Sequence, residues 1–443
     1  MVIIFPESIY MVKKSLYLTL FISLLVWFIG MPSPIYWTVP FVRAQLLFMT
    51  GIISFLYLSL ILLLSIRPKW LEKSFDGLDK IYVTHKWAGI WAMVFALLHW
   101  LVKETGKPVL GLFLEQGSKY TPVKTIFSPY ASMAKDFGEW AIWLMLAAVV
   151  ITLWQKFSYR IWRYTHKVMP VVYLLLVVHV IVLSPFSYWS QPTGMVIGVC
   201  AAIGSICAIL ALTGMIGKRH SYQGRIIQVN KHGEDIINIT CQLQGNWQHK
   251  AGQYIFLLAD KWEGAHPFTL SCSDKGKNEI SVSIKALGDY TRHLQNHLKE
   301  GDLVRVEGPY GCFQFDKQKD QKQIWIAGGI GITPFVAWLE SMLQAQSDFN
   351  PDINLYYSIR NQSEAGFVPR LQELANQLPN VQLHIHYSDE MGLLTADKID
   401  IDPDYKQSIW FCGSNAFAHD LKTALTKQNF PIKQFHQEVF VMR

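Results

Sequence analysis

The sequence predicts a multidomain membrane protein: a six-helix transmembrane bundle, then an antiparallel β-barrel, then an α/β domain with a parallel sheet. Of its 443 residues, 51% are hydrophobic and only 16% are charged, whereas a soluble chain carries about 25% charged residues. Long apolar runs end near residue 217, and short strand-like segments follow. From residue 322 onward, such segments alternate with helical ones. We therefore expect three domains, at residues 1–217, 218–318 and 319–443.

The six expected transmembrane helices lie at residues 15–30, 41–66, 81–102, 137–155, 168–184 and 193–216. Each approaches or exceeds the about 20 residues that cross a bilayer core of about 30 Å. Lys and Arg gather on one side of the spans, around residues 13, 67–80, 156–163 and 218. Because positively charged loops stay in the cytoplasm, we expect a multi-pass protein of the plasma or inner membrane with both termini cytoplasmic. The net charge of +7 then needs no nucleic-acid partner.

Four histidines lie in or at the ends of the third and fifth spans: His85 and His99 in one, His166 and His179 in the other. At 1.5 Å per residue, the two histidines of each span are about 20 Å apart. If both helices run outward, His85 is level with His166, and His99 is level with His179. A 13-residue step does not return to the same helix face, so we expect Pro170 to kink the fifth span.

These two levels predict two metal sites. A single histidine within a membrane is often a helix-to-helix hydrogen bond, but two matched pairs suit two haem irons, each held between neutral imidazoles. The six cysteines form no CxxC pair and no zinc-ligand spacing, which leaves the histidines as the candidate ligands. Two axial imidazoles leave the iron no open position, so such haems relay electrons.

Arg43 interrupts an apolar stretch at the outer end of the second span. An ionised side chain at that depth is costly and is usually functional. Arg43 is therefore our candidate partner for the outer haem and for the electron acceptor.

The barrel domain contains two chemically distinctive segments. The first is a strand with an aromatic ring and two hydroxyl groups, which suits packing and hydrogen bonding to a planar ring. Its candidate residues are His266, Pro267, Phe268, Thr269 and Ser271. The second begins a helix, whose free N–H groups suit a pyrophosphate. Its candidate residues are Gly288, Asp289, Tyr290 and Thr291.

The α/β domain begins with a buried-type strand and a glycine turn that lets the backbone approach a phosphate. The turn and the helix start that follows contribute Gly328, Gly329, Gly331, Thr333 and Pro334. Arg360 follows a later strand and suits a ribose 2′-phosphate, which favours NADPH over NADH. Cys412 and Gly413 follow another strand, where ligands of open α/β sheets collect.

Together these features resemble the NADPH oxidase and ferric reductase superfamily, over nearly the whole chain from about residue 40. The motifs are the two histidine pairs, HPFTLS, LGDYT, VEGPYG, GGIGITPF, an Arg after a strand, and FCG. The resemblance implies a ferric reductase-like membrane domain with FAD and NAD domains of the ferredoxin-NADP reductase type. It also implies that His85 and His166 bind an inner b-type haem, and that His99 and His179 bind an outer one.

The resemblance further assigns the cofactor contacts of the two other domains. It implies FAD contacts at His266, Phe268, Thr269, Gly288 and Thr291. It implies nucleotide contacts at Gly329, Gly331, Thr333, Pro334, Arg360, Cys412 and Gly413. A C-terminal aromatic residue covers the flavin in this family, and Phe440 fits best here, although three residues follow it. With Phe440, we expect Thr269, Cys412 and Arg43 beside the reacting groups.

We therefore expect an NAD(P)H-dependent transmembrane oxidoreductase that passes electrons from cytoplasmic NADPH, or NADH, through FAD and two haems to an outer acceptor. Dioxygen, giving superoxide, and a ferric chelate are both open as acceptors. A third possibility is an extracytoplasmic protein partner that docks on the 103–136 loop. The rival from another class is a non-redox membrane protein with a nucleotide-sensing domain, which would contain no haem.

Overall fold

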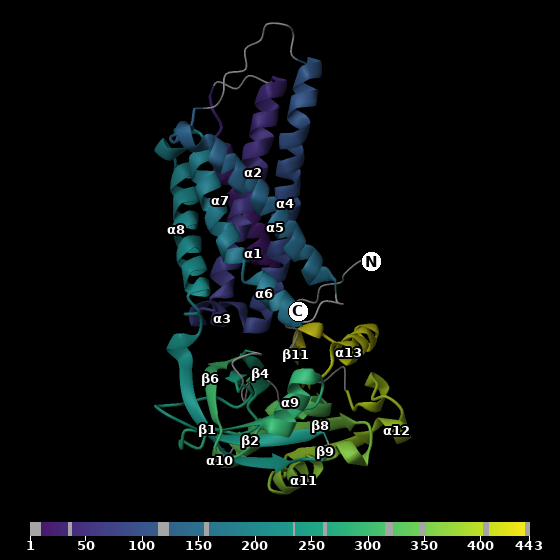
Figure 1. Cartoon of the computed structure of the whole chain (residues 1–443). Coiled ribbons are helices and arrows are strands. Elements are labelled where there is room, and N and C mark those ends of the chain that lie inside the picture. The colour runs from purple at the N-terminus through teal and green to yellow at the C-terminus, as the bar shows by residue number, and fades with distance from the viewer. Residues whose placement is uncertain are drawn as a thin grey trace. The chain divides into compact units, whose positions relative to one another are not determined.

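The computed structural model describes residues 10–33, 38–113, 124–154, 159–233, 235–259, 264–314, 322–345, 351–401 and 407–438. The chain forms two compact units (Figure 1). A helical unit takes in Ile9–Phe75 and Lys80–Ile216, and a second unit of strands and helices takes in Gly217–Val441.

The helical unit packs long helices side by side (Figure 1). Its α-helices are α1 (Tyr10–Ile29), α2 (Val39–Ser65), α3 (Lys69–Phe75), α4 (Leu78–Phe113), α5 (Ala131–Leu153), α6 (Tyr159–His166), α7 (Met169–Leu183) and α8 (Pro192–Leu212). Hydroxyl groups add directional contacts to the apolar packing. Tyr57 on α2 donates to the carbonyl of Leu16 on α1 at 2.8 Å, and Ser54 donates to Ala92 on α4 at 2.9 Å.

Within the described residues, five helical segments are long and apolar enough to cross a membrane. They are Tyr10–Ile29, Val39–Ser65, Leu78–Gly106, Ile161–Leu183 and Pro192–Leu212. Helix α5 coincides with the expected span at 137–155 but is not among the five, and its first three turns carry Lys135, Asp136 and Glu139. The multi-pass architecture is confirmed, and the count of six spans stays a prediction.

The fifth expected span is interrupted between α6 and α7. His166 ends α6, residues 167 and 168 form a turn, and Pro170 stands in the first turn of α7. Proline has no backbone N–H, and its ring excludes a continuous helix on its N-terminal side. The kink predicted at Pro170 is therefore confirmed as a break.

The second unit begins with a six-stranded antiparallel sheet of order β4-β3-β6-β1-β2-β5. Its strands are β1 (Ser221–Lys231), β2 (Ile236–Leu243), β3 (Tyr254–Leu258), β4 (His266–Thr269), β5 (Glu279–Lys285) and β6 (Leu303–Tyr310), with helix α9 (Asp289–His297) after β5. An isolated bridge from Leu270 to Val282 joins the ends of this order. The antiparallel sheet is confirmed, and full barrel closure stays a prediction.

A five-stranded parallel sheet of order β11-β10-β7-β8-β9 follows. Its strands are β7 (Lys322–Gly328), β8 (Asp352–Ile359), β9 (Val381–Tyr387), β10 (Gln407–Cys412) and β11 (Phe435–Gln437). Its α-helices are α10 (Thr333–Ala345), α11 (Val368–Asn376), α12 (Ser388–Met391) and α13 (Asn415–Lys427). The chain leaves β7 for β8 on one side and later places β10 on the other. Ligands of open α/β sheets bind beside the carboxyl ends of strands at such a reversal.

Candidate functional site

The structure brings the four histidines of the helical unit together as the two expected pairs. We call His85 and His166 the inner pair, and His99 and His179 the outer pair, after the expected orientation. Their ring centres are 6.1 Å apart in the inner pair and 6.2 Å apart in the outer pair. A metal ion bound from opposite sides by two imidazole nitrogens, each at about 2 Å, holds the rings about 6 Å apart. Both pairs therefore fit one iron each.

The outer pair is held in a ligand-ready tautomer. Nδ1 of His99 lies 2.9 Å from the carbonyl oxygen of Leu47, and Nδ1 of His179 lies 2.7 Å from that of Ala134. A carbonyl oxygen only accepts hydrogen bonds, so each Nδ1 carries the proton and donates it. Each Nε2 is then left with a free lone pair, which is the usual arrangement of a metal-binding histidine.

Each histidine of the inner pair also has a partner within the helical unit. His85 hydrogen-bonds to the backbone of Ile61 on α2, which gives it the same type of partner as the outer histidines. The ring of His166 stacks on that of Trp162, one turn earlier in α6, with centres 5.4 Å apart. Among the described residues, no group of three or more His, Cys, Asp or Glu side chains could hold a metal. The two pairs are thus the metal-site candidates of the described chain.

Two glycines make room for the outer imidazoles, and neither was predicted from the sequence. A Cβ atom at Gly51 on α2 would lie 3.2 Å from Nδ1 of His99, and one at Gly138 on α5 would overlap the ring of His179. The only signal in the sequence is a small residue within a span, and that signal does not identify the histidine it faces.

Arg43 lies near the N-terminal end of α2 and contacts the helix that carries His99. Its Nη2 donates to the carbonyl oxygen of Lys103 on α4 at 3.2 Å, and its guanidinium packs against Gly106. These contacts connect Arg43 to α4, whereas its role toward a haem or an acceptor stays a prediction.

The two segments predicted to bind flavin meet in space. The ring of His266 on β4 stacks on that of Tyr290 at the start of α9, with centres 4.0 Å apart and planes tilted by 25°. Pro267 and Phe268 pair with Phe256 and Ile255 of β3. An aromatic shelf beside a helix N-terminus fits a flavin ring with an attached pyrophosphate.

Other residues of these segments are engaged within the protein. The hydroxyl of Thr291 accepts from the backbone N–H groups of Leu287 and Gly288, at 3.0 Å each, and so caps α9. Ser271 is buried and hydrogen-bonds to Asn238 and Ser283. Thr269 is also buried, at the end of β4, and Asp289 is exposed, with Arg292 at 3.4 Å.

The glycine turn after β7 and the Cys412-Gly413 step after β10 lie against each other at the sheet reversal. A Cβ atom at Gly331 would overlap the carbonyl of Cys412, and one at Gly413 would lie 3.3 Å from the nitrogen of Gly328. Gly329 has a φ of +54°, which favours glycine. Thr333 and Pro334 are buried at the start of α10, where the Thr333 hydroxyl donates to Ile330 at 3.1 Å. Side chains are thus excluded where the two turns meet, and dinucleotide binding at this edge stays a prediction.

Cys412, the last residue of β10, is buried beside the glycine turn. Burial, and then the nearby carboxylate of Glu438, raise the pKa of its thiol well above the ordinary value. An Oε1 atom of Glu438 lies 3.3 Å from where a Cβ of Gly311 would stand. Glu438, which was not predicted from the sequence, places a buried carboxylate near Cys412. Phe440, the expected flavin cover, lies outside the described residues.

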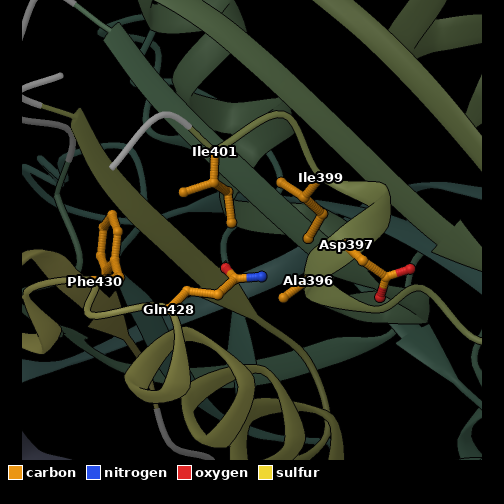
Figure 2. Close-up of a pocket in the computed structure, with 6 residues that line it drawn as sticks. All are labelled: Ala396, Asp397, Ile399, Ile401, Gln428 and Phe430. Carbon is orange, nitrogen blue, oxygen red and sulfur yellow. The ribbon is translucent and has the colours of Figure 1, made fainter. Parts of the chain in front are cut away.

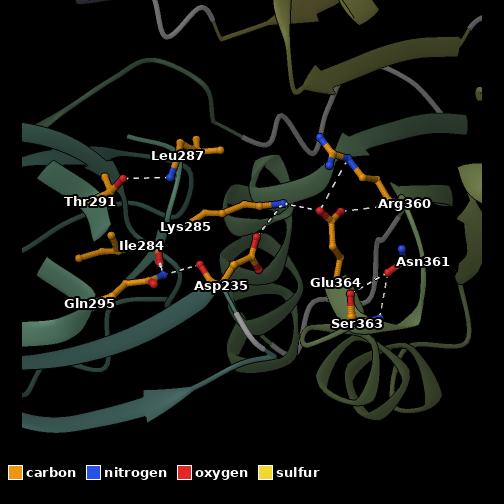
Figure 3. Close-up of polar contacts among 10 residues, drawn as sticks. All are labelled: Asp235, Ile284, Lys285, Leu287, Thr291, Gln295, Arg360, Asn361, Ser363 and Glu364. Atoms are coloured by element: carbon orange, nitrogen blue, oxygen red, sulfur yellow. Dashed lines mark hydrogen bonds and ion pairs between the residues drawn. The ribbon is translucent and has the colours of Figure 1, made fainter. Parts of the chain in front are cut away.

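Arg360 follows β8, and its side chain is 78% exposed. Its Nε atom lies 3.9 Å from Oε1 of Glu364. Glu364 accepts from the backbone N–H of Arg360 at 3.2 Å and from Lys285, at the end of β5, at 2.9 Å (Figure 3). Burial alone would raise the pKa of Glu364, but these partners outweigh it and lower that pKa below its ordinary value. Lys285 and Glu364 were not predicted from the sequence, because 79 residues separate them.

One recess in the described structure lies apart from these groups (Figure 2). It has a volume of about 250 Å³ and is lined by Ala396, Asp397, Ile399, Ile401, Gln428 and Phe430. None of the predicted site residues lines it.

Three family models match consecutive parts of the chain. A ferric reductase like transmembrane component matches residues 50–177, an FAD-binding domain matches residues 221–332, and an oxidoreductase NAD-binding domain matches residues 325–422. The first match includes His85, His99 and His166 and ends two residues before His179.

Individual proteins are also similar to parts of the chain. A superoxide-generating NADPH oxidase heavy chain of Dictyostelium discoideum is 24% identical over 339 residues, which cover 69% of this chain and 61% of that protein. A flavohemoprotein of Candida albicans is 28% identical over 202 residues, which cover 41% of this chain and 49% of that protein. The matches thus span less than two thirds of either relative.

A solved structure is also similar to half of the chain. It is the flavohem-like FAD/NAD binding domain of nitric oxide dioxygenase from Vibrio cholerae, which is 19% identical with a TM-score of 0.45. The similarity covers 49% of this chain and 98% of that domain.

A membrane helix unit followed by an FAD-binding and an NAD-binding domain defines a class of NAD(P)H-dependent membrane oxidoreductases. The three family models and the relatives together support a place in the NADPH oxidase and ferric reductase superfamily. The resemblance found in the sequence is therefore confirmed.

Proposed function

We propose that this chain carries electrons from cytoplasmic NADPH through FAD and two b-type haems to an acceptor on the outer side of the membrane. The observation that carries this proposal is the spacing of the two imidazole pairs, 6.1 and 6.2 Å between ring centres. A non-redox membrane protein with a nucleotide sensor would have no use for two such pairs, one between α4 and α6 and the other between α4 and α7.

The helical unit would hold the two haems. His85 and His166 would bind the inner iron. His99 and His179 would bind the outer one, through the Nε2 lone pairs that their backbone partners leave free. Because two protein imidazoles would hold each iron, the acceptor would not bind an iron directly. The acceptor would therefore take electrons at the outer haem edge, where we expect Arg43 to contribute positive charge.

The second unit would bind the two nucleotides. His266, Phe268 and Tyr290 would pack the flavin ring, and the start of α9 would face its pyrophosphate. The glycine turn at 328–331 and Gly413 would let NADPH approach, with Arg360 at its 2′-phosphate. Bound FAD accepts two electrons together and releases them one at a time, which joins a two-electron donor to one-electron carriers.

Two acceptors follow from the comparisons. The Dictyostelium relative is named for superoxide generation, which favours dioxygen. The membrane family model is named for ferric reductase, which favours a ferric chelate. Both would receive electrons at the same outer edge.

The test uses purified protein supplied with haem and FAD, to which NADPH or NADH is added. Oxygen consumption, superoxide and ferric-chelate reduction are measured side by side. We expect NADPH oxidation coupled to at least one of these acceptors. Absence of NADPH and NADH oxidation in protein with both cofactors bound would contradict the proposal.

A further inference from the structure

Four charged side chains meet between the antiparallel and parallel sheets of the second unit (Figure 3). The Nζ of Lys285 lies 2.9 Å from Oε1 of Glu364 and 3.3 Å from Oδ2 of Asp235. The same Oε1 atom of Glu364 lies 3.9 Å from Nε of Arg360. The carboxylate of Glu364 is thus shared between a cation from each sheet.

The four groups differ in burial. Lys285 and Glu364 are 13% and 15% exposed, whereas the side chain of Arg360 is 78% exposed. The backbone N–H of Arg360 also donates to Oε2 of Glu364, which fixes the carboxylate at the base of the arginine. Glu364 is therefore a fixed negative charge, and the guanidinium of Arg360 can move between it and a ligand.

The cluster lies close to the glycine turn at which we expect the nucleotide to bind. A Cβ atom at Gly329 in the glycine turn would lie 4.0 Å from Nζ of Lys285. Arg360 directly follows β8, the strand beside β7. A phosphate bound at Arg360 would therefore lie close to the carboxylate of Glu364, and like charges at short range repel. NADPH has a 2′-phosphate to place there, and NADH does not.

We propose that Glu364 sets the preference between NADPH and NADH by competing with the 2′-phosphate for Arg360. This inference rests on the proposed function, in which the chain oxidises a nicotinamide nucleotide. Glu364 acts through Arg360 and is a specificity-determining residue that need not touch the nicotinamide. Its charge lowers the advantage that Arg360 gives to NADPH and leaves NADH almost unaffected.

Two other carboxylates near Arg360 provide matched controls. Asp235 pairs with Lys285 at 3.3 Å, as Glu364 does, and so acts on the lysine rather than on the guanidinium. Asp389 donates its backbone N–H to the carbonyl of Arg360 at 3.0 Å, but its carboxylate accepts from Asn361 at 2.9 Å. The Asp235→Asn and Asp389→Asn variants therefore remove a negative charge of the same region without freeing the guanidinium.

The experiment uses the full chain with FAD bound and ferricyanide as acceptor, so that haem is not required. The ratio of kcat/KM for NADPH to that for NADH is measured in the wild type and in Glu364→Gln, which keeps an oxygen for Lys285. We expect the ratio to rise about two- to five-fold, the size of one partly exposed charge interaction. The rise should shrink at high salt. It should be absent in Asp235→Asn, in Asp389→Asn and in the Arg360→Ala background.

Binding of 2′,5′-ADP and 5′-AMP is measured by calorimetry on the same proteins. We expect Glu364→Gln to bind 2′,5′-ADP more tightly than the wild type does, and to bind 5′-AMP with unchanged affinity. Equal changes for both ligands, or a raised ratio that persists without Arg360, would overturn the role of Glu364. If the wild type binds 2′,5′-ADP but oxidises neither nucleotide, the proposed function fails and the binding arm still decides this inference.

Discussion

In the helical unit each outer histidine donates to a backbone carbonyl, at 2.9 and 2.7 Å, whereas in the second unit Lys285 and Arg360 face a carboxylate. A carbonyl partner fixes the proton of a neutral imidazole on Nδ1 and leaves Nε2 free, which suits a metal that stays bound. A carboxylate partner neutralises a cation until a phosphate displaces it, which suits a ligand that arrives and leaves. The difference is consistent with the proposed function, in which the helical unit would hold permanent cofactors and the second unit an exchangeable nucleotide.

The largest expected effect comes from removing a ligand of the outer pair. In His99→Leu, haem content should fall from about two to about one per chain, because one imidazole does not hold a six-coordinate iron. Reduction of the external acceptor should be lost, while NADPH-dependent ferricyanide reduction through the flavin persists. Pyridine haemochrome assay and acceptor assays measure both. The control is His419→Leu, which replaces an exposed histidine on α13. Normal reduction of the external acceptor by His99→Leu would contradict the proposed electron path through the outer haem.

A smaller effect should follow from disturbing the position of the same ligands. In Gly138→Ala the new methyl group overlaps the ring of His179. Misplacing a metal ligand costs about 10- to 100-fold in affinity, so outer-haem occupancy should fall while the inner haem stays. In the control Gly198→Ala the added Cβ meets Trp189 at an ordinary 3.9 Å. Equal haem content in both variants would show that Gly138 does not set the imidazole position.

On the nucleotide side, Arg360→Ala should lower kcat/KM for NADPH about ten-fold, the value of a hydrogen bond to a charged group. The value for NADH should stay within about two-fold, because NADH has no 2′-phosphate for Arg360 to bind. Steady-state kinetics with both nucleotides measures this. Equal losses for NADPH and NADH would mean that Arg360 supports the local structure after β8 and does not recognise the phosphate.

The smallest effect concerns Cys412, which is expected beside the reacting groups yet buried. Alkylation requires the thiolate, and a raised pKa lowers the thiolate fraction at any given pH. With iodoacetamide at about pH 8, Cys412 should remain unmodified while the half-buried Cys312 reacts. Mass spectrometry of peptides from the folded protein reads out both sites. Rapid modification of Cys412 would show that this edge opens to solvent.

The sequence predicted the parts that depend on local pattern. The pairing of His85 with His166, and of His99 with His179, follows from residue counting along two helices plus the break at Pro170. The antiparallel and parallel sheets follow from strand spacing and from the alternation of strands with helices.

Other parts depend on contacts between distant segments and carry no local pattern. Glu364 meets Lys285 across 79 residues, and Gly138 meets His179 from a neighbouring helix. Ser271 hydrogen-bonds to Asn238 and Ser283, contacts that the sequence did not predict, and its contact with the flavin stays a prediction. The side of the sheet to which a hydroxyl turns depends on its neighbours, and the residue type alone does not determine it.

The measurement that tests the central claim most directly is haem spectroscopy of the purified full chain, produced with ample porphyrin. The imidazole pairs predict about two b-type haems per chain, both six-coordinate and low-spin, and both reduced by NADPH when FAD is bound. Purified, folded protein that shows no low-spin six-coordinate haem would contradict the account.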